Sequence, residues 1–377
     1  MNEHADIDKV LSELRHGNSC LMLNENSAGG VTGFVVVGAE HCEARHIAFM
    51  ARQARGLVCL AMTRARCEEL ELPLMVEGDD SLTPFTLSIE AATGIDTGIS
   101  AADRARTVRV AVDATSRASD LVQPGHIFPI AAAAGGVLTR TAPAEAAMDL
   151  ATLAGLIPAA VFTEVLDNQG AMADATFLNE FAVQHGLVVG RVSDLVTYRL
   201  ANQKTITSVR QGILQSRHGA FEMHAFQDTT QGRVHLALKK GEIDAATPTL
   251  VRVHVTAVFR DLVGTSLDGH PSWSFDASLK AIAESESGVL VLLSKPETAD
   301  DLLQGIDRLL GATDTDAGAA GDGYNQIGMG AQILRALGVG KIRLLGAPLK
   351  YNALSGFGLE VVDFVSPESL AESLGKE

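Results

Sequence analysis

Cysteine is scarce in this chain and is confined to its beginning. The 377 residues include four cysteines, and the last of them is Cys67. A zinc site built from thiolates needs several cysteines near one another, so the chain after Cys67 cannot build one. No two cysteines form a C-x-x-C pair, and we expect reduced thiols rather than disulfides. Cys59 lies in the apolar run Leu57–Leu60, which predicts a buried thiol.

Long apolar runs and clusters of positive charge are missing as well. No run approaches the roughly 20 residues that cross a bilayer, and Met1–Leu14 lacks the layout of a signal peptide. The net charge of −16 repels phosphate backbones, so we expect no nucleic-acid partner. We therefore expect a cytoplasmic protein that has no membrane partner.

The composition supports packed cores, with 46% hydrophobic and 20% charged residues. A chain of this length fits two domains of roughly 100–200 residues each. Helical and strand patterns are mixed along both halves and predict an α/β fold with helices layered on sheets. The sequence predicts helices over residues 6–16, 40–55, 101–112, 144–154 and 331–337, and strands over 20–23, 34–37, 57–62, 85–91, 161–166, 187–189, 288–293 and 341–345.

A polar stretch separates the two halves. Residues 201–216 are rich in glutamine and basic side chains, which is typical of a linker. We place the first domain at residues 1–203, the linker at 204–216 and the second domain at 217–377.

Three stretches of the first half carry long motifs. They are Thr97–Arg104 with Thr107, Pro124–Pro129 around His126, and Ala134–Arg140 with Glu145. With Glu164 downstream, this set resembles 3,4-dihydroxy-2-butanone 4-phosphate synthase of riboflavin biosynthesis over about residues 8–200. The resemblance implies an α+β layered-sheet domain.

The second half resembles the GTP cyclohydrolase II domain that often follows this synthase. The matching stretches are Leu250–His254, Gly330–Arg335, Leu337–Leu345 and Leu354–Glu360. The resemblance implies an α/β cyclohydrolase II-like domain behind the synthase-like one.

The synthase family converts ribulose 5-phosphate to dihydroxybutanone phosphate and formate with a divalent cation. The resemblance assigns proton transfer to His126 and Glu164. It assigns substrate contacts to the following positions: Arg140, Thr107, Asp103, Cys59, Thr139 and Glu145. Taken alone, His126 also fits a hydrogen-bonded histidine in a Pro-Gly-His turn, and Glu164 fits a carboxylate at a strand end.

The magnesium ligands of the synthase family are replaced. Its acidic loop corresponds to residues 23–33, where Glu25 is the one carboxylate left. Pro143 stands where the family has a metal-binding histidine, and a proline side chain cannot bind magnesium. We expect no magnesium site.

The cyclohydrolase-like half lacks all three zinc cysteines of its family. The family's nucleotide-contacting run is replaced by Ser294–Thr298. We expect no zinc and no GTP cyclohydrolase activity.

Three hypotheses follow. The first is a homodimeric synthase homologue that binds a phosphosugar such as ribulose 5-phosphate and has weak or no standard activity. The second is a repurposed, metal-independent phosphosugar lyase or isomerase that uses His126, Glu164 and Arg140. The third is a non-enzymatic partner of riboflavin-pathway enzymes, including mixed dimers with an intact paralogue.

Overall fold

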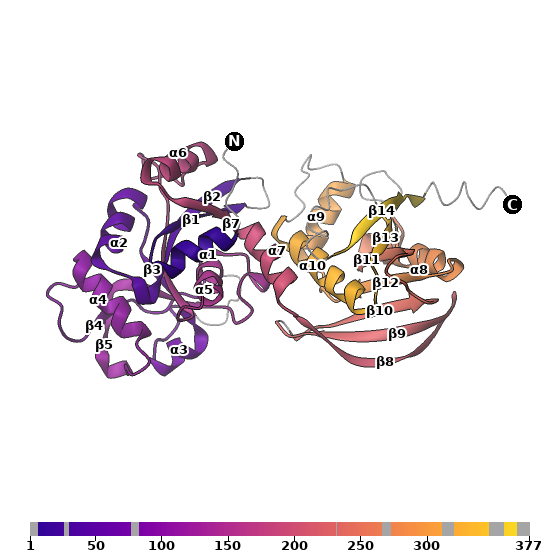
Figure 1. Ribbon diagram of the computed structural model, residues 1–377, viewed down its shortest axis with the longest axis horizontal. Helices are drawn as coiled ribbons and strands as arrows, with labels where there is room; N and C mark the ends of the chain where they lie inside the picture. Colours follow the sequence, from indigo (N-terminus) through magenta and orange to yellow (C-terminus); the bar gives the residue numbers. More distant parts are fainter. Residues whose placement is uncertain are drawn as a thin grey trace. The chain divides into compact units, whose positions relative to one another are not determined.

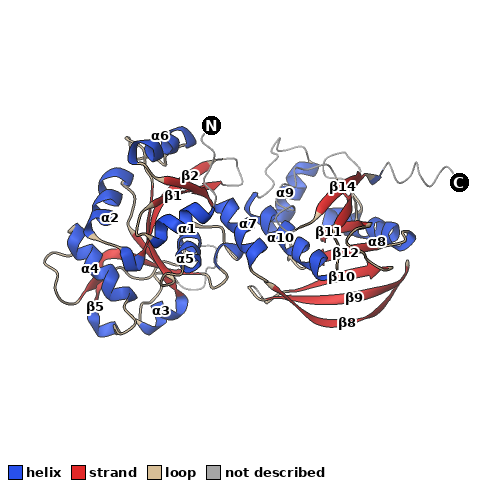
Figure 2. Ribbon diagram, in the orientation of Figure 1, coloured by secondary structure: helices blue, strands red, loops and turns tan. Residues whose placement is uncertain are grey.

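The chain folds into two compact units. The structure is a computed structural model that describes residues 7–25, 30–76, 83–230, 232–265, 273–310, 320–346 and 358–367. The first unit comprises Met1–Tyr198 and Ala319–Gly321, and the second comprises Arg199–Gly318 and Asp322–Glu377. Each unit contains one seven-stranded sheet with helices packed on it (Figures 1 and 2). The predicted α/β class is confirmed for both halves.

The first unit has a mixed sheet in the order β4-β5-β3-β6-β2-β1-β7. Its strands are β1 (Cys20–Glu25), β2 (Val31–Gly38), β3 (Cys59–Thr63), β4 (Ile89–Ala91), β5 (Leu121–Ala132), β6 (Ala159–Glu164) and β7 (Val188–Arg191). Its helices are α1 (Ile7–Arg15), α2 (Ala44–Phe49), α3 (Arg64–Glu69), α4 (Ala101–Val112), α5 (Pro143–Leu153), α6 (Ala175–His185) and α7 (Val192–Asn202), with short helical turns at Ala39–His41, Met50–Ala54, Ala118–Asp120 and Gly136–Leu138.

Strand alternation divides the side chains of this sheet between two faces. Val35, Leu60 and Val161 point into a core that also takes in buried residues of α2, α4 and α6. The alternate residues face α1 and α5: a Cβ on Gly38 would meet Leu156 just after α5, and α5 packs on β6, β3 and β2. The sheet is therefore covered on both faces.

The second unit has its sheet in the order β14-β13-β11-β12-β10-β9-β8. Its strands are β8 (Ile206–Ser216), β9 (Gly219–Asp228), β10 (Val234–Lys240), β11 (Pro248–Val255), β12 (Gly288–Leu293), β13 (Lys341–Leu345) and β14 (Glu360–Val365). Its helices are α8 (Phe275–Glu284), α9 (Ala299–Leu309) and α10 (Ala320–Ala336), with a helical turn at Val258–Val263. Strands β11–β14 pair in parallel, and β8–β10 complete the sheet in antiparallel fashion.

The predicted linker at 204–216 is wrong. Strand β8 fills most of it and pairs with β9 from Ile206–Asp228 to Ser216–Gly219. Because β8 lies at the edge of the sheet, most of its side chains are exposed, and its polar sequence resembles that of a linker. The division between the units falls earlier, between Tyr198 and Arg199 in α7.

The helix predicted over 40–55 is interrupted. It is built from the turn Ala39–His41, α2 and the turn Met50–Ala54, and Arg55 ends it in a left-handed conformation (φ 67°). No helix among the described residues is long and apolar enough to cross a bilayer.

Candidate active site

Three predicted site residues of the first unit share one face of the sheet. Cys59 on β3 is the register partner of Phe128 on β5 and of Phe162 on β6. His126 lies two residues before Phe128, and Glu164 lies two residues after Phe162. Paired residues, and residues two apart on a strand, point to the same face. Cys59, His126 and Glu164 therefore project toward the face that α5 covers.

Cys59 is not a nucleophile in this environment. Burial, reinforced by the negative charge of Glu164, raises the pKa of the Cys59 thiol to about 12. A thiolate rather than a thiol is the reactive form. At neutral pH Cys59 contributes shape and an apolar contact surface.

His126 is paired with Glu90, a residue that the sequence analysis does not single out. The Nδ1 atom of His126 contacts the Glu90 carboxylate, and the two side chains are 43% and 15% exposed. Because a carboxylate accepts, the pairing directs the Nδ1–H of His126 to Glu90 and leaves Nε2 for proton transfer. Glu90 thus positions the imidazole that the motif predicts as an acid–base group.

Asp103 and Thr107 build the turn beside this pair. The Asp103 carboxylate accepts the Gly98 N–H at 3.1 Å, and the Thr107 hydroxyl accepts the Ala91 N–H at 3.1 Å. Ser100 caps α4 by accepting the Asp103 N–H at 3.1 Å. Both predicted residues are buried, so in this chain they hold the backbone around Glu90 in place.

Arg140 is oriented by Glu145. The guanidinium donates to Glu145 Oε1 from Nε at 3.1 Å and from Nη2 at 2.6 Å, and the same oxygen accepts the Ala133 N–H at 3.0 Å. The Glu145 side chain is fully buried, whereas that of Arg140 is 29% exposed. Such a pre-oriented guanidinium suits recognition of a phosphate. Thr139 next to it is exposed.

The positions of the family's metal ligands are occupied by other interactions. Glu25 Oε1 forms an ion pair with Arg191 Nη1 at 2.6 Å, which links the ends of β1 and β7. Asn24 donates weakly to the Thr141 carbonyl at 3.4 Å. Pro143 is at the first position of α5, where the missing N–H of proline costs no hydrogen bond. This donor set does not fit a hard divalent cation, which requires several oxygen ligands.

In the second unit, His254 on β11 belongs to a buried network. Its Nε2 contacts Asp261 Oδ2 at 3.0 Å, and Asp261 also accepts the N–H groups of Ala257 and Phe275, both at 2.8 Å. Burial, with the charge of Arg260, lowers the pKa of His254 to about 4. Burial alone would raise the pKa of Asp261, but hydrogen bonds led by that from Arg260 hold it well below its usual range. The network fixes the loop after β11.

No set of three histidine, cysteine, aspartate or glutamate side chains in the described part of either unit is grouped as metal ligands are. The four cysteines, all buried and all in the first unit, have no disulfide partner.

Residues 8–198 match the 3,4-dihydroxy-2-butanone 4-phosphate synthase family, and residues 207–366 match the GTP cyclohydrolase II family. A 3,4-dihydroxy-2-butanone 4-phosphate synthase of Pseudomonas aeruginosa is 44% identical over 364 residues, 96% of this chain and 99% of that protein. The chain belongs to the 3,4-dihydroxy-2-butanone 4-phosphate synthase family. A riboflavin biosynthesis protein RibBA of Aquifex aeolicus is 36% identical, over 95% of this chain and 91% of that protein.

Solved structures agree with this dihydroxybutanone phosphate synthase assignment. RibBX, a two-domain synthase from A. baumannii, superimposes with a TM-score of 0.81 at 37% identity, over 96% of this chain and 99% of that one. A synthase in complex with two magnesium ions is 31% identical, with a TM-score of 0.50, and covers 52% of this chain and 98% of its own. The predicted family, with its riboflavin-biosynthesis setting and both domain types, is confirmed.

The site residues that the motifs name, and the role of each, stay predictions. The motifs do not include Glu90 and Arg191, because each is paired with a residue distant in sequence, His126 and Glu25 respectively. A carboxylate inside the short apolar strand β4 is the one sequence signal that favours Glu90.

Proposed function

We propose that the first unit binds a phosphosugar such as ribulose 5-phosphate but has little or no magnesium-dependent synthase activity. The observation that carries this proposal is the paired replacement of the metal ligands: Glu25 is engaged with Arg191, and Pro143 begins α5. Arg140, the phosphate contact that the family resemblance implies, is present and is held by Glu145. Loss of most metal ligands, with the remaining carboxylate engaged elsewhere, lowers the rate of a site that relies on Lewis-acid catalysis by several orders of magnitude.

The decisive experiment is a formate assay. The purified chain is incubated with ribulose 5-phosphate and magnesium, beside a family member that keeps the acidic loop and the histidine. We expect binding of the phosphosugar, measured calorimetrically, without formate production above a small background. Turnover equal to that of the comparison enzyme would refute the proposal.

We also propose that the second unit is not a GTP cyclohydrolase and that the chain uses neither zinc nor magnesium. The support is chemical, since the second half contains no cysteine to bind and activate zinc. Metal analysis after purification without chelators should find well below one zinc per chain. Stoichiometric zinc together with hydrolysis of GTP would contradict this.

The His126–Glu90 pair favours a second candidate, a metal-independent lyase or isomerase acting on a related phosphosugar. A histidine oriented by a carboxylate, with Glu164 on the same face, can move a proton next to a carbonyl. Such activity would exchange a substrate C–H for deuterium in D₂O with a chelator present. His126→Asn should abolish the exchange. If the unaltered chain shows no exchange, this candidate is excluded.

A non-enzymatic role in the cytoplasm is the third candidate, and we propose a homodimer as the basic assembly. The family resemblance supports both, because the synthase family places its sites near a subunit interface. Light scattering would give the assembly size. Co-purification with a co-expressed intact paralogue would support mixed dimers, and strictly separate elution would argue against them.

A further inference from the structure

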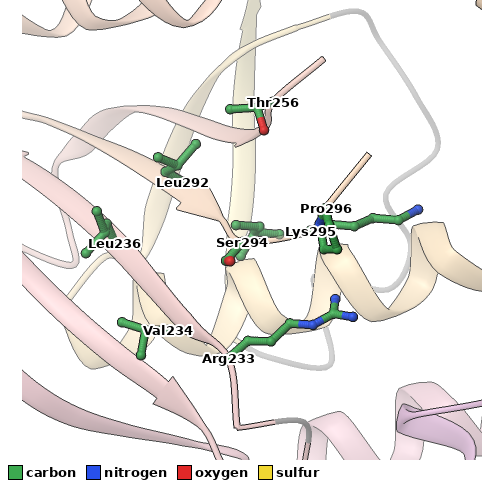
Figure 3. Close-up of a pocket in the computed structure, with 9 residues that line it drawn as sticks. Arg233, Val234, Leu236, Thr256, Leu292, Ser294, Lys295 and Pro296 are labelled. Atoms are coloured by element: carbon green, nitrogen blue, oxygen red, sulfur yellow. The ribbon is translucent and has the colours of Figure 1, made fainter. Parts of the chain in front are cut away.

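A cavity of about 580 Å³ lies in the second unit, at the carboxyl ends of β11 and β12. Ser294, Lys295 and Pro296 line it, and they belong to the run at the nucleotide-contacting position of the cyclohydrolase family (Figure 3). This cavity therefore corresponds to the ligand position of that family. A smaller pocket, of about 310 Å³, lies in the first unit, and its lining residues differ from those of the candidate active site.

The smaller pocket lies on the sheet face opposite to the candidate active site. Helix α6, which contributes most of its lining, buries Leu178 and Phe181 in the core shared with α2 and α4. Cys59, His126 and Glu164 instead project toward the face that α5 covers. The volume of the pocket is at the lower end of the range for ligand sites, so the pocket suits a small molecule.

Two uncommon backbone conformations meet at this pocket. The turn Met50–Ala54 is a single turn of π-helix, and the Arg55 N–H closes it by donating to the Met50 carbonyl at 2.8 Å. Arg55 itself has a left-handed φ of 67°, which is rare for a residue that is not glycine. Both features occur preferentially at functional sites. Gln53 on the turn and Arg55 after it both line the pocket.

The pocket combines a positive and a negative side chain. Arg55 is anchored, because its Nη1 donates to the Leu166 carbonyl at 3.3 Å, and Glu180 lines the pocket from α6. Among the residues that the structure describes, neither Arg55 nor Glu180 forms an ion pair, so both charges are available to a ligand. A guanidinium pairs with a carboxylate, and a carboxylate pairs with an ammonium group. The two charges together therefore suit a zwitterion.

Aromatic rings form one wall of the pocket. Phe177 stacks on Phe181 with the ring centroids 6.4 Å apart, and His185 meets Phe181 edge-on at 4.6 Å. This wall offers apolar surface to the body of a ligand. Amide groups, which both donate and accept hydrogen bonds, complete the lining: Gln53, Asn168 and Gln184.

We propose that this pocket binds a free amino acid whose carboxylate contacts Arg55 and whose ammonium group contacts Glu180. The side chain of the amino acid lies on the wall of Phe177 and Phe181, and the amide groups of the lining add hydrogen bonds. Because the pocket and the candidate active site are on opposite faces of the sheet, the proposal stands or falls independently of the phosphosugar function proposed above.

The twenty standard L-amino acids, offered one at a time to the full chain in calorimetric titrations, are the probes. We expect at least one to bind at one site per chain. Its N-acetyl derivative lacks the ammonium charge and its carboxamide lacks the carboxylate, so each should bind about tenfold more weakly. Arg55→Gln and Glu180→Gln should each weaken binding of the amino acid by a similar factor. In Glu180→Gln, the amino acid and its N-acetyl derivative should bind within about twofold of each other, because the partner of the ammonium group is gone.

Arg45→Gln and Glu69→Gln are the matched controls, since they remove the same charges from side chains that are 64% and 65% exposed and lie outside the pocket. They should leave the affinity within about twofold of that of the unaltered chain. Circular dichroism checks the fold of each variant, and Glu180→Gln alone decides if Arg55→Gln misfolds. Absence of binding by all twenty amino acids, or equal affinity in the pocket variants and the controls, would overturn the proposal.

Discussion

His254 makes the stability of the second unit sensitive to acid. Its folded-state pKa is about 4, against 6.5 for an ordinary histidine. Between these values the unfolded chain binds more protons than the folded one, so stability falls as the pH drops from about 6.5 to 4. The full effect of a shift this size is about 3 kcal/mol. Asp261 keeps its charge throughout this window, because its pKa lies well below it.

Trp273 is the single tryptophan of the chain and is buried in the second unit, so its fluorescence reports the unfolding of that unit. Urea titrations at pH 7, 6 and 5 should show a declining free energy of unfolding. His254→Gln should make the free energy of unfolding depend less on pH. Part of the dependence should remain, because burial also lowers the pKa of His235. If the free energy of unfolding depended on pH equally in the variant and the unaltered chain, His254 would not be the source of the acid sensitivity.

Arg140 is predicted to carry phosphate recognition in the first unit. Arg140→Ala removes the guanidinium and leaves the fully buried Glu145 without its cation, so ribulose 5-phosphate binding should weaken by about tenfold or more. Calorimetric titration measures it. Arg45→Ala, which removes an arginine that is 64% exposed, is the control. Unchanged phosphosugar affinity in Arg140→Ala would place the phosphate elsewhere.

Residues named by motifs are predictable from sequence, but their partners are not. Arg140 and Glu145 lie five positions apart within one motif, and the structure joins them. Glu25 and Arg191 are separated by most of the first unit, and only the parallel pairing of β1 with β7 brings them together. Without strand order, no pattern connects such a pair.

At the scale of elements, the turn before α4 controls the His126–Glu90 pair. Gly98 has a left-handed φ of 77°, and a Cβ there would overlap the Glu90 carboxylate. Gly98→Ala should therefore displace Glu90 and change the NMR chemical shifts of the His126 ring. Gly170→Ala, at φ 83° with open space around it, shares the backbone strain without the overlap. If both variants changed the NMR signals of His126 equally, the turn before α4 would not control the His126–Glu90 pair.

Element prediction succeeds where burial gives periodicity and fails where it does not. Helix α4 is found to the residue, because it buries one face, and α5, which is buried all round over Ala144–Ala151, is found within one residue. Strand β8 is missed, since an edge strand with exposed side chains carries no alternating apolar pattern. The predicted end of the helix over 40–55 agrees with the structure, where Arg55 closes it, but the extended residues Cys42 and Glu43 that separate the turn Ala39–His41 from α2 are missed.

At the scale of the whole molecule, each unit carries its own chemical reporter. All four cysteines belong to the first unit and are buried, and burial raises the pKa of Cys20, Cys42 and Cys59 to about 12 and that of Cys67 to about 11. Ellman's reagent at pH 8 should therefore react slowly with the folded chain and reach four equivalents in denaturant. Rapid reaction of any thiol in the folded chain would contradict the burial of that cysteine.

The ion pair of Glu25 with Arg191 and the proline that begins α5 also bear on whether a magnesium site could be engineered into this chain. Under the function proposed above, a magnesium site would need changes at two distant points of the chain, and each point has a local structural role, an ion pair at Glu25 and a helix start at Pro143. Pro143→His alone gives up the restriction that proline places on the unfolded chain, at a cost of roughly 0.4–1 kcal/mol, without recreating an acidic loop. Under the proposed function, neither change alone would give back a magnesium site.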